Sequence, residues 1–232
     1  KHLFADNLKD ELWLVAGGVF GGSLYFFTEN TALGITQASN VAFIICTAPL
    51  LTTILSLIFY KSEKATKGLI YGSLLALIGV GMVVFNGSVV LKLSPVGDLL
   101  TLLAALSWAF YSLVIKRMTG RYPTVFITRK IFFYGVLTIL PAFLLHPLQP
   151  DFDVLLQPLV LSNLLFLAVL ASLICYILWN VVLKQLGTMR ASNYIYLNPL
   201  VTMVASVLIL HEQITWITLM GAACIILGVY LA

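Results

Sequence analysis

Eight long apolar segments divide this chain, and they restrict its fold more than any other feature of the sequence. Each is close to the roughly 20 residues that a helix needs to cross the hydrocarbon layer of a membrane. They cover residues 12–31, 36–60, 67–86, 96–116, 130–147, 159–183, 191–210 and 215–232. Backbone groups in lipid must pair within their own segment, which favours helices over the short alternating strands of a barrel. The sequence therefore predicts an all-α integral membrane protein with eight transmembrane helices.

The composition excludes a soluble fold. Hydrophobic residues make up 61% of the 232 residues and charged residues only 9%, and the mean hydropathy is +1.04. A soluble domain carries about 25% charged residues, so this chain could not cover a surface that faces water. Membrane lipid is therefore the expected surrounding. The net charge of +4 is typical of cytoplasmic loops, and we expect no nucleic-acid partner.

The basic residues predict an orientation. If the N-terminus lies inside the cell and all eight segments cross the membrane, every Lys and Arg except Lys92 falls on the inner side. The connection between the fifth and sixth segments, on the outer side, carries Asp151 and Asp153 instead. Cytoplasmic loops are enriched in Lys and Arg, so both ends of the chain are predicted to be cytoplasmic.

The chain also contains an internal repeat. LGITQASN at 33–40 matches LGTMRASN at 186–193, PLLT at 49–52 matches PLVT at 199–202, and EKAT at 63–66 matches EQIT at 212–215. Gly72 and Gly79 correspond to Gly221 and Gly228. The pattern predicts that residues 1–90 form the last three helices of a first repeat and residues 91–232 a complete second repeat of five helices. Two further helices are expected to precede Lys1.

The two repeats are predicted to be inverted relative to each other. The connection at 61–67 is basic and predicted inside, whereas its counterpart at 211–214 lacks Lys and Arg and is predicted outside. Inverted repeats place a substrate site at their interface near the middle of the membrane, and one half can rock against the other.

These motifs resemble the drug/metabolite transporter superfamily, in particular its EamA-type branch of ten helices. The resemblance rests on the paired ASN and PLLT/PLVT motifs, the repeated E-x-x-T with its glycines, and GDLLTLLAALSWAFYSLVIKR at 97–117. It implies ten helices in the full length, both termini in the cytoplasm and transport of small metabolites or drugs, often as export. It also implies a plasma membrane location, in bacteria the inner membrane. An amino-acid-like substrate is one expectation, and a homodimer stays open.

The matched helices carry the first candidate site residues. Pro49 and Pro199 should interrupt the helices at 36–60 and 191–210, and matched interrupted helices in both halves point to a transporter site. A packing kink without ligand contact is the alternative. Further candidates for the cavity lining are polar residues of the same two helices: Asn40, Asn193, Tyr194, Tyr196 and Asn198. The amides could instead bond helices together.

Other candidates lie in three neighbouring segments. Glu29 is the one acidic residue well inside an apolar run, either in the cavity or at the membrane surface. Trp108 and Tyr111, with Trp179 and Asn180, are candidates of lower weight because aromatic residues also anchor helix ends. Thr66 and Thr215 should cap helices, with Glu63 and Glu212 near the positive helix start.

Other functions fit less well. An intramembrane enzyme would need a recognisable nucleophile and base, a metal cluster or paired buried carboxylates, and none of these patterns occurs. A channel filter motif and an ATP-binding loop are also missing from the sequence. Among transporters, a sugar-nucleotide or organophosphate carrier is the alternative, although the basic residues sit in loops. We therefore predict a secondary transporter of a small molecule, with no metal and no cofactor.

Overall fold

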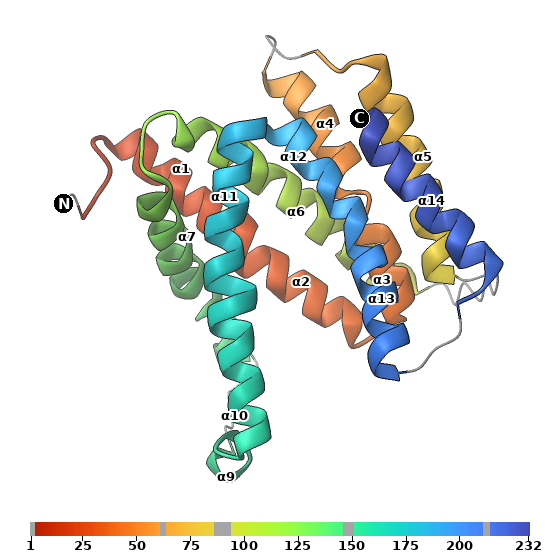
Figure 1. Ribbon diagram of the computed structural model, residues 1–232. Coiled ribbons are helices and arrows are strands. Elements are labelled where there is room, and N and C mark those ends of the chain that lie inside the picture. The colour runs from red at the N-terminus through yellow and green to blue at the C-terminus, as the bar shows by residue number, and fades with distance from the viewer. Residues whose placement is uncertain (1–2, 61–63, 86–93, 146–150, 211–213) are drawn as a thin grey trace.

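A computed structural model describes residues 3–60, 64–85, 94–145, 151–210 and 214–232 (Figure 1). These described residues form helices and connections, with no strand among them. The helices of the first half are α1 (Leu8–Gly18), α2 (Leu24–Leu33), α3 (Ala38–Ile45), α4 (Ala48–Phe59) and α5 (Lys67–Phe85). Those of the second half are α6 (Pro95–Thr119), α7 (Thr124–Ile139), α8 (Ala142–Leu145), α9 (Phe152–Leu155), α10 (Pro158–Leu165), α11 (Cys175–Leu186), α12 (Thr188–Asn193), α13 (Asn198–Leu210) and α14 (Trp216–Leu231).

Each predicted apolar segment overlaps a described helix. Wide π turns at Val19–Ser23 and Phe166–Ile174 join α1 to α2 and α10 to α11 without a break. Within the described residues, four helices are long and apolar enough to cross a membrane: Ala38–Phe59, Lys67–Phe85, Pro95–Thr119 and Pro158–Leu186. In Figure 1 the last of these extends well beyond its neighbours, and little of it is buried.

One predicted boundary is wrong. The fifth segment was expected to start at Lys130, but α7 begins at Thr124, directly after Pro123. Lys130 is buried inside the helix, where its ammonium pairs with the carboxylate of Glu11 and lies 4.4 Å from the centre of the Phe4 ring. The paired charge is therefore tolerated within the helix, and it does not mark where the helix starts.

Both matched prolines accompany a helix interruption. A turn at Cys46 and Thr47 separates α3 from α4, and Pro49 occupies the first turn of α4, where no amide donor is needed. A 3₁₀ segment, Tyr194–Leu197, separates α12 from α13, and Pro199 is the second residue of α13. The tighter turn lets the carbonyl of Ile195 accept the N–H of Asn198. The two prolines themselves are buried.

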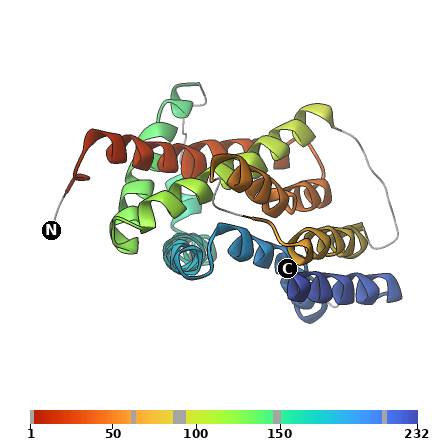
Figure 2. The ribbon, with the colours of Figure 1, turned by 90° about the horizontal axis from the view of Figure 1, so that it is seen from above.

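Two matched helices pack against each other along their glycines. The helices α5 and α14 lie side by side in both views (Figures 1 and 2), and each begins at a threonine cap, Thr66 or Thr215. A Cβ added at Gly79 would lie 2.5 Å from the carbonyl oxygen of Gly221, and one at Gly228 would lie 2.5 Å from that of Gly72. The backbones thus touch directly, as small residues allow in membranes. We call this contact the glycine seam. Glu63 and Glu212 lie outside the described residues.

A polar network fastens α1 to the connection between α6 and α7. The carboxylate of Asp10 accepts hydrogen bonds from Arg121 at 2.9 and 3.0 Å and from the Tyr122 hydroxyl at 3.0 Å. Burial raises the pKa of the Asp10 carboxyl, but the hydrogen bonds from Arg121, Asn7 and Tyr122 outweigh it and hold that pKa below its usual value of 3.8. This end of α1 is therefore held through charged groups.

Candidate functional site

Aromatic rings from three helices gather around Trp108, near the centre of α6. The centre of its ring lies 5.2 Å from the rings of Tyr25 and Tyr111 and 5.9 Å from those of Tyr176 and Trp179. Tyr25 belongs to α2, and Tyr176 and Trp179 belong to α11. We call these five residues the aromatic cluster. Their tilted and edge-on contacts are the arrangements that aromatic pairs prefer.

Hydrogen bonds hold the buried side of the cluster. The Tyr111 hydroxyl donates to Oδ1 of Asn180 at 2.8 Å, and Nδ2 of Asn180 donates to the Thr128 hydroxyl at 2.9 Å. Tyr111 and Asn180 are both 0% exposed. Each polar group in this series of hydrogen bonds has a partner. The series therefore fixes α6, α7 and α11 relative to one another.

The π turn at Val19–Ser23 supplies two further acceptors. The carbonyl of Gly21 accepts the Tyr176 hydroxyl at 2.7 Å, and the carbonyl of Phe20 accepts the Ser107 hydroxyl at 3.0 Å. A π turn alters the regular helical pairing of carbonyls, and such turns are frequent at functional sites. Here the turn ties α6 and α11 to the helix that carries Glu29.

Glu29 lies at the edge of the cluster and is partly buried. Its carboxylate accepts a hydrogen bond from the Tyr25 hydroxyl at 3.1 Å, and it lies within electrostatic range of Tyr176. The described residues provide it with no Lys, Arg or His partner. The indole N–H groups of Trp108 and Trp179 are buried and have no acceptor in the described part of the chain. The carboxylate beside the cluster and the two indole donors within it thus keep bonding capacity that the described residues do not use.

The remaining candidates lie nearer the glycine seam. Asn193 is 2% exposed, and its Oδ1 accepts a hydrogen bond from the Ser73 hydroxyl of α5 at 2.8 Å. Its Nδ2 has no acceptor among the described residues. Tyr196 is fully buried beside Ser73, and Asn40 is buried in α3. Cys46, in the turn between α3 and α4, packs in the same core cluster as Tyr196 and lies within electrostatic range of Tyr25.

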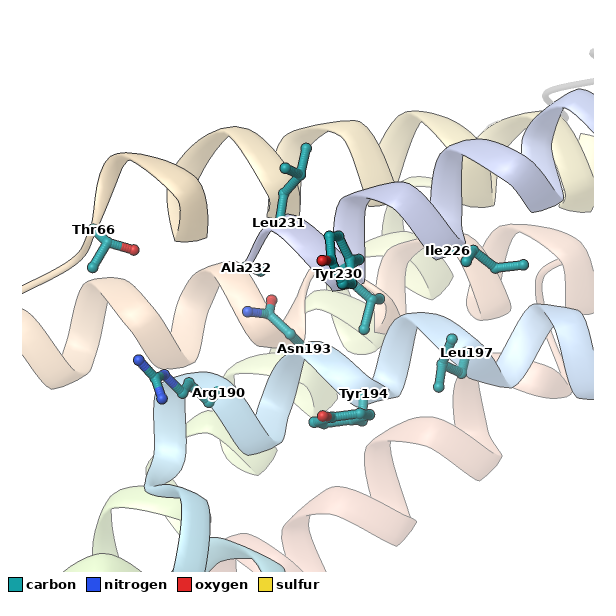
Figure 3. Close-up of a pocket in the computed structure, with 10 residues that line it drawn as sticks. Thr66, Arg190, Asn193, Tyr194, Leu197, Ile226, Tyr230, Leu231 and Ala232 are labelled. Carbon is teal, nitrogen blue, oxygen red and sulfur yellow. The ribbon is translucent and has the colours of Figure 1, made fainter.

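Asn193 also faces a groove of about 680 Å³. In Figure 3, Arg190 and Asn193 extend from α12 into this groove, and Tyr194 and Tyr230 line it. Asn198, by contrast, is exposed at the start of α13 and is not brought together with the other candidates. The predicted polar and aromatic residues are therefore divided. Trp108, Tyr111 and Trp179 belong to the aromatic cluster with Glu29 and Asn180 beside it, Asn193 and the exposed Tyr194 line the groove, and Asn40, Tyr196 and Asn198 belong to neither.

Tyr25, Tyr176, Ser73 and Thr128 were not among the residues predicted from the sequence. Tyr25 precedes Glu29 by four residues and Tyr176 precedes Asn180 by four, so each shares a helix face with a predicted residue. That spacing could have found both tyrosines. Ser73 and Thr128 join through contacts between helices, which no local spacing reveals. No group of three His, Cys, Asp or Glu side chains that could hold a metal occurs in the residues that the structure describes.

Comparisons with known proteins agree with the motifs. The EamA-like transporter family matches residues 1–85 and 95–232. The chain is 30% identical to the uncharacterized transporter YyaM of Bacillus subtilis, over 93% of this chain and 70% of that protein. It is 29% identical to a Salmonella typhimurium protein named "Probable amino-acid metabolite efflux pump", over 75% of this chain and 60% of that protein.

One solved crystal structure of a protein matches with a TM-score of 0.77 at 19% identity, over 95% of this chain and 75% of that one. At that identity the match shows the fold alone. The family match spans nearly all of the sequence and accounts for its apolar helices. This chain therefore belongs to the EamA-like transporter family and is a multi-pass membrane protein.

Proposed function

We propose that this protein is a secondary transporter that exports a small metabolite or drug by alternating access between two inverted halves. The family match and the relatives named as transporters support transport in general, and the efflux pump among them supports export. The same names favour a transporter over an enzyme. The inverted arrangement of the two halves is supported by the contacts of the glycine seam.

The contacts of the seam are reciprocal. Gly72 meets Gly228, and Gly79 meets Gly221. Since Gly72 corresponds to Gly221 and Gly79 to Gly228, exchanging the halves turns the first contact into the second. Gly79 also approaches the amide of Ile225, and Gly228 approaches that of Ala76, which occupies the matching position. Such pairwise exchange is the mark of a two-fold axis.

The direction of the two helices supports an axis in the membrane plane. Along the seam the numbers rise in α5 while they fall in α14, so the helices are antiparallel. A two-fold axis along the membrane normal would relate parallel helices, whereas an axis in the membrane plane relates antiparallel ones. The seam therefore supports inverted halves, and with them a site between the halves.

Contacts between connections support eight spans with both ends in the cytoplasm. Asp10, near the N-terminus, bonds to Arg121, and Lys116 lies 4.3 Å from the centre of the Tyr60 ring. All four lie at ends predicted inside. The Thr36 hydroxyl donates to the carboxylate of Asp98 at 3.1 Å, and both lie at ends predicted outside. Each contact thus joins connections of the same predicted side.

We propose that the substrate binds between the halves, next to the interrupted helices. The candidates are the aromatic cluster with Glu29 and Asn180, together with Asn40, Asn193 and Tyr196. Cys46, in the turn between α3 and α4, packs with Tyr196 and lies within electrostatic range of Tyr25. Interrupted helices expose backbone groups that a substrate can use, and the interruptions at Pro49 and Pro199 occur at matched positions in the two halves.

An export screen tests the function. The full-length gene is overexpressed, and metabolites in the medium are compared with those from cells expressing Asn193→Ala. We expect a metabolite that accumulates outside with the wild type and falls with this variant, because Nδ2 of Asn193, at the proposed interface, has no acceptor among the described residues. Asn198→Ala is the matched control, since Asn198 is exposed. Equal export by all three proteins, with folded protein confirmed by size-exclusion chromatography, would contradict the proposal.

A further inference from the structure

Glu29 has no basic counterpart in the part of the chain that the structure describes. Among the described residues only the Tyr25 hydroxyl bonds to its carboxylate, at 3.1 Å, and no basic side chain pairs with it. A charge in apolar surroundings is costly unless it is paired. The basic residues at the end of α6 have other contacts, since Lys116 lies over Tyr60 and Arg117 lies 4.8 Å from the centre of the Trp13 ring.

The rings beside Glu29 suit a cation. Tyr25 contacts the carboxylate and also lies 5.2 Å from Trp108, whose ring is 5.9 Å from Tyr176. Tyr176 is within electrostatic range of Glu29. A cation within about 6 Å of an aromatic ring centre is attracted to the ring face, and such rings recognise ammonium groups. The carboxylate and three electron-rich rings therefore favour the same kind of ligand.

We propose that Glu29, Tyr25, Trp108 and Tyr176 bind the ammonium group of an organic cation. This inference rests on the proposed function because it names the substrate class of the same site. The carboxylate supplies the opposite charge and the rings supply flat apolar surface. The unused N–H groups of Trp108 and Trp179 are available to a hydrogen-bond acceptor on the same ligand.

Direct binding tests this proposal without relying on transport. The full-length protein in detergent is titrated with benzyltrimethylammonium, and binding is followed by tryptophan fluorescence and by calorimetry. Phenylacetate, an anion of similar size, is the comparison probe. We expect the cation to bind, phenylacetate to bind at least about tenfold more weakly, and Glu29→Gln to weaken cation binding by about tenfold or more. Trp108→Leu should also weaken it, whereas Trp108→Phe, which keeps a ring, should weaken it less.

Asp153→Asn is the matched control, because it removes one negative charge at an exposed position. Affinity of Glu29→Gln within twofold of both the wild type and Asp153→Asn would overturn the proposal, as would equal binding of the two probes. Folding of each variant is checked by size-exclusion chromatography, and the conservative Glu29→Gln keeps an acceptor for Tyr25. Cation binding that depends on Glu29 in a protein that exports nothing would sustain this inference and refute the proposed function. Export by a protein whose cation binding does not depend on Glu29 would sustain the proposed function and refute this inference.

Discussion

The glycine seam and the aromatic cluster are both contacts between helices, and they are built in opposite ways. In the seam, α5 and α14 meet backbone to backbone, and an added Cβ at Gly79 or Gly228 would strike a carbonyl. In the cluster, large rings of α2, α6 and α11 pack against one another, and buried donors of Trp108 and Trp179 have no acceptor among the described residues.

The difference separates a structural contact from a candidate site. Close packing at the paired glycines leaves no room for a ligand, so we expect the seam to hold the halves together. The cluster combines a rigid part, in which Tyr111, Asn180 and Thr128 satisfy one another, with a part that has bonding capacity to spare. Substitutions should therefore affect stability at the seam and binding at the unused groups.

The largest effect is expected at the seam. Gly79→Leu places a side chain where a Cβ alone would lie 2.5 Å from the carbonyl oxygen of Gly221. Overpacking commonly costs about 1–3 kcal/mol, and a clash with backbone costs more, so we expect little folded protein. Gly120→Leu is the control, because nothing lies within 4 Å of a Cβ added there. The measurement is the yield of monodisperse protein in detergent, and similar yields for the two variants would show that the seam is not tightly packed.

The rigid part of the cluster should give the next largest effect. Tyr111→Phe removes the donor to Oδ1 of the fully buried Asn180, and an unsatisfied buried polar atom costs about 1–3 kcal/mol. The midpoint of thermal unfolding should therefore fall. Tyr71 is 68% exposed, so Tyr71→Phe is the control and should change the unfolding midpoint little. If both variants unfold like the wild type, the chain from Tyr111 to Thr128 does not stabilise the cluster.

Local sequence features predicted much of the fold. The apolar segments overlap described helices, the two prolines accompany interruptions, and Thr66 and Thr215 cap their helices as expected. All of these depend on spacing within one segment. The start of α7 could not be predicted in the same way, because the charge of Lys130 is neutralised by Glu11, which lies 119 residues away.

The candidate site was predictable only in part, for the same reason. Glu29 and Asn180 are visible in the sequence as polar residues in apolar runs. Their partners depend on how helices pack. The acceptors at Phe20 and Gly21 depend on a π turn that no sequence motif predicts. The sequence thus indicated which helices matter, whereas packing determined which side chains meet.

A smaller effect on stability, with a clear effect on transport, is expected at the unused groups of the cluster. Trp108→Phe removes an N–H that has no acceptor in the described chain and keeps an aromatic ring. Stability should fall by less than about 1.5 kcal/mol, while export should fall about two- to tenfold through the lost hydrogen bond. Trp216→Phe, at a position 82% exposed, is the control. A large loss of stability with unchanged export would show that Trp108, like the glycine seam, serves the structure and not the transport.

The smallest effect is expected on the unfolding temperature at low pH. It tests whether the glycine seam and the aromatic cluster account for stability by themselves. The network at Asp10 lies before the expected first span, and its hydrogen bonds hold the Asp10 pKa below the usual 3.8 despite burial. A carboxyl whose pKa is lowered by folding stabilises the protein above its unfolded pKa, and this contribution is lost as the pH falls through the folded pKa. The unfolding temperature should therefore drop below about pH 4 in the wild type, and Asp10→Asn should lower it at neutral pH and flatten that drop.

Trp108→Phe should retain the wild-type pH profile. An unchanged acid response in Asp10→Asn would mean that this network does not couple protonation to folding, and that the acid response arises at other carboxyl groups.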